Sequence, residues 1–173
     1  TIDRQNGVAA AKLCTLLDGN PLALELAATL TNSYDLATLF AELTHNYTLL
    51  AADLQDLPPR QRSIHNTIDY SWRMLPAELA MLMAQCSTFR GNFQYEAVAA
   101  ITNASLRSTT QLIHRSLLHK GEHQNLYVHE MVRQFAAKKL AQNPSLQLTT
   151  NQKHSEYYLG ELNAWWNETE SKH

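Results

Sequence analysis

Glycine and proline are scarce in this chain, and their positions limit its fold more than any other feature. The 173 residues include five glycines and five prolines, and all of them except Gly7 and Gly160 stand where helical patterns end. Both residues are unfavourable inside a helix, because glycine is too free and proline lacks an N–H donor. Gly19 is placed to end one helix in the left-handed conformation, and Pro21 suits the first turn of the next. The pattern predicts a mainly α-helical protein.

Apolar residues recur at intervals of three and four between these breaks, which is typical of helices with one buried face. Asp35 has the side chain of a good N-cap residue. The stretch 116–129 differs, because two short apolar ends flank a polar, glycine-containing centre at 121–125, and this predicts a β-hairpin. The helices expected are 3–17, 21–31, one from Asp35, one on each side of Pro76, 93–102, 105–117, 130–142 and 148–169.

The proline pair Pro58–Pro59 marks the clearest boundary, since the residue before a proline avoids the helical conformation. We expect a small helical bundle over residues 1–57. Residues 58–143 have the order of a winged helix-turn-helix, in which two short helices are followed by a hairpin and a returning helix. Residues 144–173 are interpreted as the first helix of a TPR-like or other helical array. Its aromatic stripe should pack on the winged helix or on the next helix of that array: Tyr158, Leu162, Trp165 and Trp166.

Composition and charge exclude several classes of protein. The formal net charge is −2 with histidine neutral, which is a poor electrostatic match for duplex DNA. No apolar run approaches the roughly 20 residues that span a bilayer, and no signal peptide opens the chain. The chain begins without Met and already in a helical pattern, so we expect a piece of a longer cytoplasmic protein. Cys14 and Cys86 each fall on an apolar helical face, and we interpret both as buried free thiols in a reducing compartment.

Three motifs in order resemble those of the STAND-class signalling ATPases of the NB-ARC type, including bacterial transcriptional regulators. "GNPLALELAATL" resembles their GxPLAL motif, and "YVHEMVRQFA" resembles their MHD motif, with Val128, His129 and Glu130 in place of Met-His-Asp. Between them, the segment from Pro58 is similar to the family's R-x-R-S-L, W-S-Y-x-L-L and F-x-G-G-F pieces. The matching residues are Arg60, Arg62, Ser63, Ile64, Ser71, Trp72, Leu75, Phe89, Gly91 and Phe93. The resemblance covers about residues 5–143.

The resemblance implies a nucleotide-gated switch that holds ADP or ATP together with an upstream nucleotide-binding domain of the same protein. Gly19, Pro21 and Leu22 would form the corner whose proline packs on adenine, and His129 would reach the β-phosphate of ADP. This chain has no G-x-x-x-x-G-K-[ST] loop, so the Mg²⁺ ion and ATP hydrolysis would belong to the absent domain. From the residues alone, Gly19 and Pro21 could equally make a plain corner between two helices. No cofactor is expected for the chain by itself.

Two other functions remain open, and neither is enzymatic. A DNA-binding winged helix would need basic side chains on the helix 105–117 and the wing, where Arg107, Arg115 and Lys120 are the cations. Three cations make direct nucleic-acid contact a weak expectation. A helical interaction scaffold with a degenerate nucleotide site is the third interpretation. No Ser/His/Asp or Cys/His constellation predicts catalysis, no His or Cys spacing predicts a metal site, and the remaining partners expected are downstream helical repeats rather than a membrane.

Overall fold

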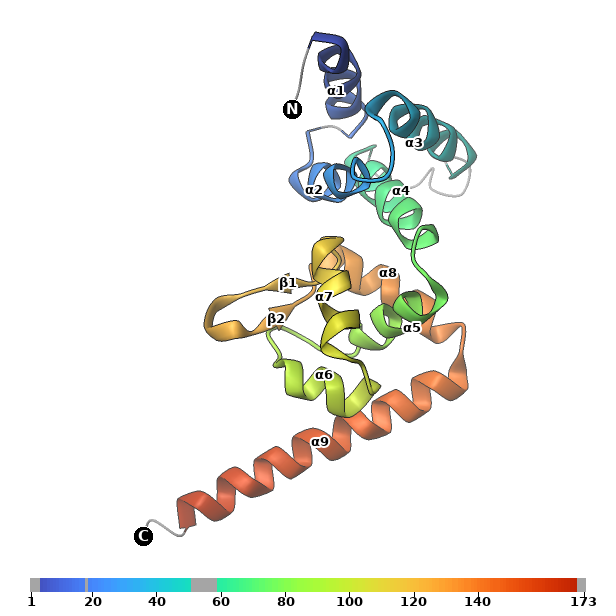
Figure 1. The fold of residues 1–173 in the computed structure, drawn as a ribbon. Coiled ribbons are helices and arrows are strands. Elements are labelled where there is room, and N and C mark those ends of the chain that lie inside the picture. The colour runs from blue at the N-terminus through green and yellow to red at the C-terminus, as the bar shows by residue number, and fades with distance from the viewer. Residues whose placement is uncertain (1–3, 18, 51–58, 171–173) are drawn as a thin grey trace. The chain divides into compact units, whose positions relative to one another are not determined.

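A computed structural model describes residues 4–17, 19–50 and 59–170, and it is mainly helical with one small antiparallel hairpin (Figure 1). The chain divides into two compact units. The first, here called the helical unit, comprises Thr1–Pro76 with His114–Leu117. The second, called the hairpin unit, comprises Ala77–Ile113 with Leu118–His173. The predicted helical bundle and hairpin are confirmed at this level.

Local capping explains why the first helices begin and end where they do. The helical unit contains α1 (Arg4–Leu16), α2 (Pro21–Leu30), α3 (Leu36–Leu50) and α4 (Pro59–Arg73). Gly19 has a φ of +59°, the left-handed conformation predicted for it, and Pro21 opens α2. Asn20 caps that helix, since its Oδ1 accepts the Ala23 N–H at 3.1 Å. Asp35 caps α3 in the same way, accepting the N–H of Thr38 at 2.9 Å. Each predicted cap is therefore present.

The core of the helical unit is built by α2 and α3 packing on α4 and by α1 packing on α3. The side chains that fill it are largely leucines: Leu13, Leu17, Leu22, Leu26, Leu30, Leu39, Leu43, Ile64 and Ile68. The predicted burial of Cys14 is wrong, because the buried side of α1 runs through Leu13 and Leu17 and leaves Cys14 exposed. Cys86, in the other unit, is completely buried as expected.

The two cysteines should therefore differ sharply in reactivity towards a thiol reagent such as DTNB. Burial raises the pKa of the Cys86 thiol to about 12, so it supplies almost no thiolate, which is the reactive form. We expect one thiol, that of Cys14, to react within minutes in the native chain and the second to react only on unfolding. The C14S variant should show no fast phase; a fast phase of equal size in C14S would contradict the burial of Cys86.

The hairpin unit begins with α5 (Ala77–Cys86), α6 (Tyr95–Thr102) and α7 (Leu106–His114). A hairpin follows, with β1 (His119–Lys120) and β2 (Leu126–Tyr127) joined through the short 3-10 helix η1 (Glu122–Gln124). Phe93 extends this sheet by an isolated antiparallel bridge to Leu126, with N···O distances of 2.9 and 2.7 Å. The chain then forms α8 (Glu130–Ala141) and α9 (Pro144–Glu170). The bridge at Phe93 pins the turn before α6 to the hairpin.

The last helix begins earlier than predicted and has two different faces. Asn143 accepts the Leu146 N–H at 3.1 Å, so Pro144 starts α9 rather than only ending the preceding helix. One face, through Thr150 and Tyr157, lies against α6 and α8. From Tyr158 on, every described residue of α9 is exposed, and Leu162, Trp165 and Trp166 are 57–60% exposed. Of the two predicted partners, the winged-helix segment therefore does not cover these three side chains, and the next helix of an array stays a prediction. No helix within the described ranges has the length and apolar character needed to cross a bilayer.

Candidate functional site

The corner between α1 and α2 exposes two of the predicted binding residues and buries the third. Gly19 and Pro21 are exposed, whereas the Leu22 side chain is 8% exposed and belongs to the core. The turn is held by the Asn20 cap and by the Gly19 N–H, which donates to the Cys14 carbonyl at 3.0 Å. The apolar ring of Pro21 is therefore accessible to a ligand, while the buried Leu22 side chain holds the corner against the core.

His129 lies at the start of α8, in the hairpin unit, so the structure does not bring it together with the Gly19–Pro21 corner in one unit. Its side chain is exposed, and its Nδ1 atom accepts the Met131 N–H at 3.3 Å. An imidazole that accepts at Nδ1 carries its proton on Nε2. His129 therefore caps its helix with one nitrogen and presents an N–H donor with the other.

Glu130, the residue that replaces the aspartate of the MHD pattern, is held within its own helix. Its two carboxylate oxygens accept from Arg133 at 2.7 and 2.8 Å and from Gln134 at 2.9 Å. The hydrogen bonds from Arg133, followed by that from Gln134, lower the pKa of Glu130 to about 2. Arg133 also donates to the Ser87 carbonyl at 3.3 Å, so this pair ties α8 to the end of α5.

Acid should remove the contribution of Glu130 to stability. Its folded pKa of about 2 lies below the ordinary 4.5 of the unfolded chain, so the contribution is present above pH 4.5 and is lost as pH falls towards 2. In urea unfolding followed by circular dichroism, Glu130→Gln should be less stable than the wild type at pH 6, and the difference should shrink by pH 3. A difference that stays constant between these pH values would contradict the assignment.

The helices α6 and α7 are joined by the short connection 103–105. Asn103 ends α6 in the left-handed conformation, with φ 58°, and the Ser105 Oγ accepts the Ser108 N–H at 3.1 Å to cap α7. The connection has three residues, a length that helix-turn-helix motifs use. The hairpin follows directly after α7, so the order of elements is the one expected from the sequence.

The outer face of α7 is polar, and sequence reasoning found only part of it. Ser108, Thr109 and Leu112 are buried, whereas Arg107, Gln111 and His114 are exposed. These three outer residues recur at intervals of four and three, which places them on one side of the helix. The sequence prediction considered basic residues alone, so it included Arg107 but not Gln111 and His114. The helical period places these two residues on the same side as Arg107. Lys120 is exposed on β1, and Arg115 is half-buried within the segment His114–Leu117.

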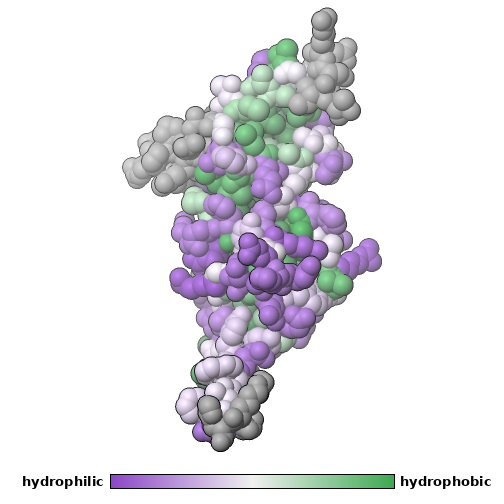
Figure 2. Space-filling view, turned by 90° about the vertical axis from the view of Figure 1, so that its left-hand side faces the viewer, coloured by the Kyte–Doolittle hydropathy of each residue, from purple (hydrophilic) through white to green (hydrophobic). Residues whose placement is uncertain are grey.

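In Figure 2, the face of the hairpin unit that carries the hairpin is mainly hydrophilic. Over its whole sequence, the hairpin unit has eight basic and eight acidic residues, so these side chains give it no net charge. Among the described residues, no group of three or more His, Cys, Asp or Glu side chains could hold a metal ion.

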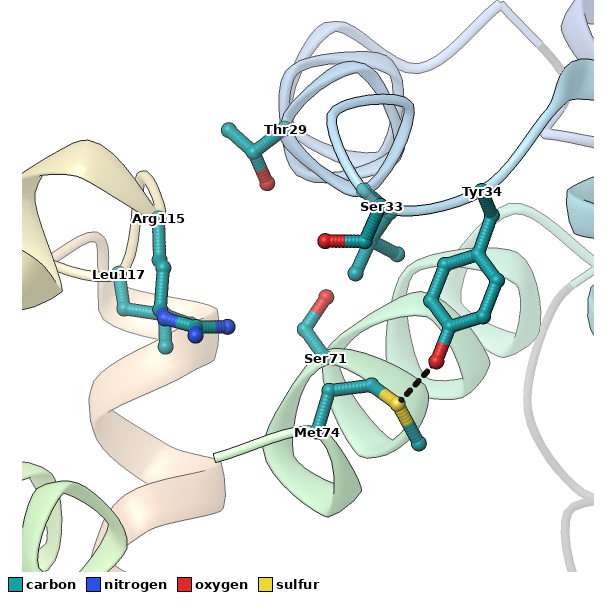
Figure 3. A pocket seen from close by; sticks show the side chains of 8 residues that line it. Thr29, Ser33, Tyr34, Ser71, Met74, Arg115 and Leu117 are labelled. Carbon is teal, nitrogen blue, oxygen red and sulfur yellow. Dashed lines mark hydrogen bonds between the residues drawn. The ribbon is translucent and has the colours of Figure 1, made fainter. Parts of the chain in front are cut away.

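A small cavity lies in the helical unit, between the end of α2, α4 and the segment His114–Leu117 (Figure 3). Its volume is about 120 Å³. Polar side chains line much of it, and three of them, Ser33, Ser71 and Arg115, point towards one another (Figure 3). No sequence pattern indicated this cavity, because its residues come from three separate parts of the chain.

No family model matches this chain, and no solved structure matches it. It is similar to "Putative HTH-type transcriptional regulator Rv0890c" of Mycobacterium tuberculosis (strain ATCC 25618 / H37Rv), with 29% identity over 168 residues. A Mycobacterium bovis relative, "Putative HTH-type transcriptional regulator Mb0914c", matches with the same identity. These matches cover 91% of this chain but 19% of each relative, so the chain spans about a fifth of their length. "Uncharacterized protein Rv0894" of M. tuberculosis is 26% identical over 100 residues, which are 58% of this chain and 25% of that protein. The longer matches support a protein that resembles transcriptional regulators.

Proposed function

We propose that this chain is part of a cytoplasmic transcriptional regulator and that residues 58–143 include a winged helix-turn-helix which contacts DNA. In this proposal α7 is the recognition helix, and the hairpin 119–127 is the wing. The observation that carries it is the polar outer face of α7, which follows a helix-turn-helix connection and precedes the hairpin. The relatives named as HTH-type regulators support the same function.

The exposed side chains of α7 have the chemistry of base readout. Arg107 can donate two hydrogen bonds to guanine, and Gln111 can pair with adenine through its amide. His114, one turn further, can donate to either a base edge or a phosphate. In this proposal Lys120, on the wing that directly follows the recognition helix, contacts the phosphate backbone of the DNA. With about two phosphate contacts, the logarithm of the DNA-binding constant should fall with the logarithm of the salt concentration with a shallow slope of about −2.

The test is selection of bound sequences from a random duplex library by the 173-residue chain at low salt. The proposal predicts enrichment of one short motif and a fluorescence-anisotropy isotherm that competes with unlabelled motif but not with scrambled duplex. Recovery of the unselected library composition, with no saturable binding at about 50 µM chain, would contradict DNA contact by this unit.

The second candidate function is the nucleotide switch, and the geometry of His129 favours it. Its Nε2 bears the proton and is exposed, so it can donate to a phosphate oxygen as a charge-assisted hydrogen bond. The exposed ring of Pro21 supplies an apolar face of the kind that suits adenine. We propose that ADP or ATP, with Mg²⁺ held by an upstream nucleotide-binding domain, is bound in the full-length protein with help from Gly19, Pro21, Leu22 and His129.

This second function is tested on the full-length protein. Heat-denatured wild-type protein should release about one ADP per molecule, and the His129→Ala variant should retain less than a tenth of that amount after purification. His114→Ala removes an exposed imidazole at another place and should retain the wild-type amount. Absence of nucleotide from the wild type, with no binding of added ADP at 1 mM, would rule out the switch.

We also propose that downstream helices of an array cover the outer face of α9. Leu159, Leu162, Trp165 and Trp166 are exposed along the second half of α9, and such an apolar stripe normally has a partner. In a Trp72→Phe background, acrylamide should quench the two remaining tryptophans freely in this chain. In the full-length protein the quenching of Trp165 and Trp166 should fall at least threefold. Equal quenching in the 173-residue chain and in the full-length protein would contradict this proposal.

A further inference from the structure

The cavity of the helical unit contains a guanidinium group with no counter-ion. Arg115 is half-buried, and it makes no hydrogen bond or ion pair with any residue in the described part of the chain. Arginine keeps its charge in proteins, and a partly buried charge normally has a partner. No acidic residue lines the cavity. Among the described residues, Arg115 therefore supplies a positive charge without an acidic partner at the edge of a small, partly open cavity.

Two hydroxyl groups face the same space. The Ser71 side chain is 5% exposed, and its Oγ is buried without a hydrogen-bond partner. Ser33, an exposed residue of the turn after α2, points towards Ser71, and the guanidinium of Arg115 approaches from the other side (Figure 3). A buried hydroxyl without a partner costs about 1–3 kcal/mol, so the fold retains an unsatisfied donor that points into the cavity.

The other polar groups of the cavity are already committed as donors. The Thr29 hydroxyl donates to the Leu26 carbonyl at 2.8 Å, and the Tyr34 hydroxyl donates to the Met74 sulfur at 3.0 Å. The available donors are therefore Ser33, Ser71 and the guanidinium fork of Arg115. All three can donate at once only to an acceptor that offers several oxygen atoms in different directions.

We propose that this cavity binds a small tetrahedral oxyanion of the phosphate class, through Arg115, Ser33 and Ser71. Arginine pairs with phosphate by two parallel hydrogen bonds, and the serine hydroxyls can donate to two further oxygens. The volume of about 120 Å³ suits a group of this size. The site lies in the helical unit, and its Arg115 directly follows His114 of the DNA-binding face proposed for α7. It would add an anion-responsive element to the chain.

The experiment measures the thermal unfolding of the 173-residue chain with inorganic phosphate, using chloride at matched ionic strength as the reference. At 20 mM, phosphate and sulfate should each raise Tm by about 2–4 °C, because a ligand that binds only the native state stabilises it. The ³¹P signal of phosphate should broaden on addition of chain. Acetate should have no effect; a rise with acetate but none with phosphate would overturn the phosphate class.

Three variants locate the effect. Arg115→Gln and Ser71→Ala should each abolish the phosphate-dependent rise, whereas Arg90→Gln, which removes an exposed guanidinium from the hairpin unit, should keep it. Ser71→Ala should also leave the Tm without phosphate unchanged or higher, since it removes an unsatisfied buried hydroxyl; a merely structural serine would lower it. A phosphate effect of equal size in Arg115→Gln, or no effect in the wild type, would overturn the proposal.

Discussion

Replacing Phe89 by alanine is expected to destabilise the hairpin unit by about 3–5 kcal/mol, the cost of removing a large ring from a well-packed core. Phe89 is 2% exposed and stacks on Phe93 with 4.2 Å between ring centroids. Its ring also lies 5.5 Å from that of His154 on α9. One side chain therefore links the turn before α6, the bridge to the hairpin and the last helix.

The measurement for Phe89→Ala is urea unfolding followed by circular dichroism. Leu106→Ala is the control, because Leu106 is 64% exposed and its truncation should change the free energy of unfolding by less than about 0.5 kcal/mol. A loss below about 1 kcal/mol in Phe89→Ala would show that these three parts do not share a core.

The second large effect is expected from removing Arg107 and Gln111 together. Each bidentate contact to a base is worth about 1–3 kcal/mol, so the double alanine variant should bind the selected duplex on the order of a hundredfold more weakly. Both side chains are exposed, so the Tm should stay within about 1 °C of the wild type.

Arg90→Ala combined with Gln94→Ala is the matched control for the α7 variant. It removes the same two residue types, also exposed and also four positions apart, from outside α7. Binding within threefold of the wild type is expected for this control. If both double variants bind equally well, α7 does not read the duplex.

The sequence predicted those parts of the fold that local chemistry determines. Gly19 and Pro21 form the corner between α1 and α2 because their backbone preferences act without tertiary help, and Asp35 caps α3 through its own oxygens. The hairpin at 119–127 followed from a polar tip between apolar ends. Capping and turn chemistry act over a few residues, which makes such features readable from one sequence.

Features that depend on packing between distant segments were predicted less well. Cys14 lies one position away from the buried line of α1, and an apolar pattern alone did not separate the two sides. Pro144 was interpreted as a stop, although the Asn143 cap makes it a start. The cavity at Ser71 combines α2, α4 and a segment forty residues later. The roles of Gly19, Pro21, Leu22 and His129 in nucleotide binding and the boundaries 1–57, 58–143 and 144–173 stay predictions.

The most direct test of the central claim is a ¹⁵N NMR titration of the chain with the selected duplex. The proposal places the contact on α7 and the hairpin, so amide shifts should concentrate at Leu106–His114 and 119–127. The amides of α2 and of the second half of α9 should not move. Unchanged spectra at saturating duplex, or shifts confined to elements other than α7 and the hairpin, would contradict a helix-turn-helix that contacts DNA.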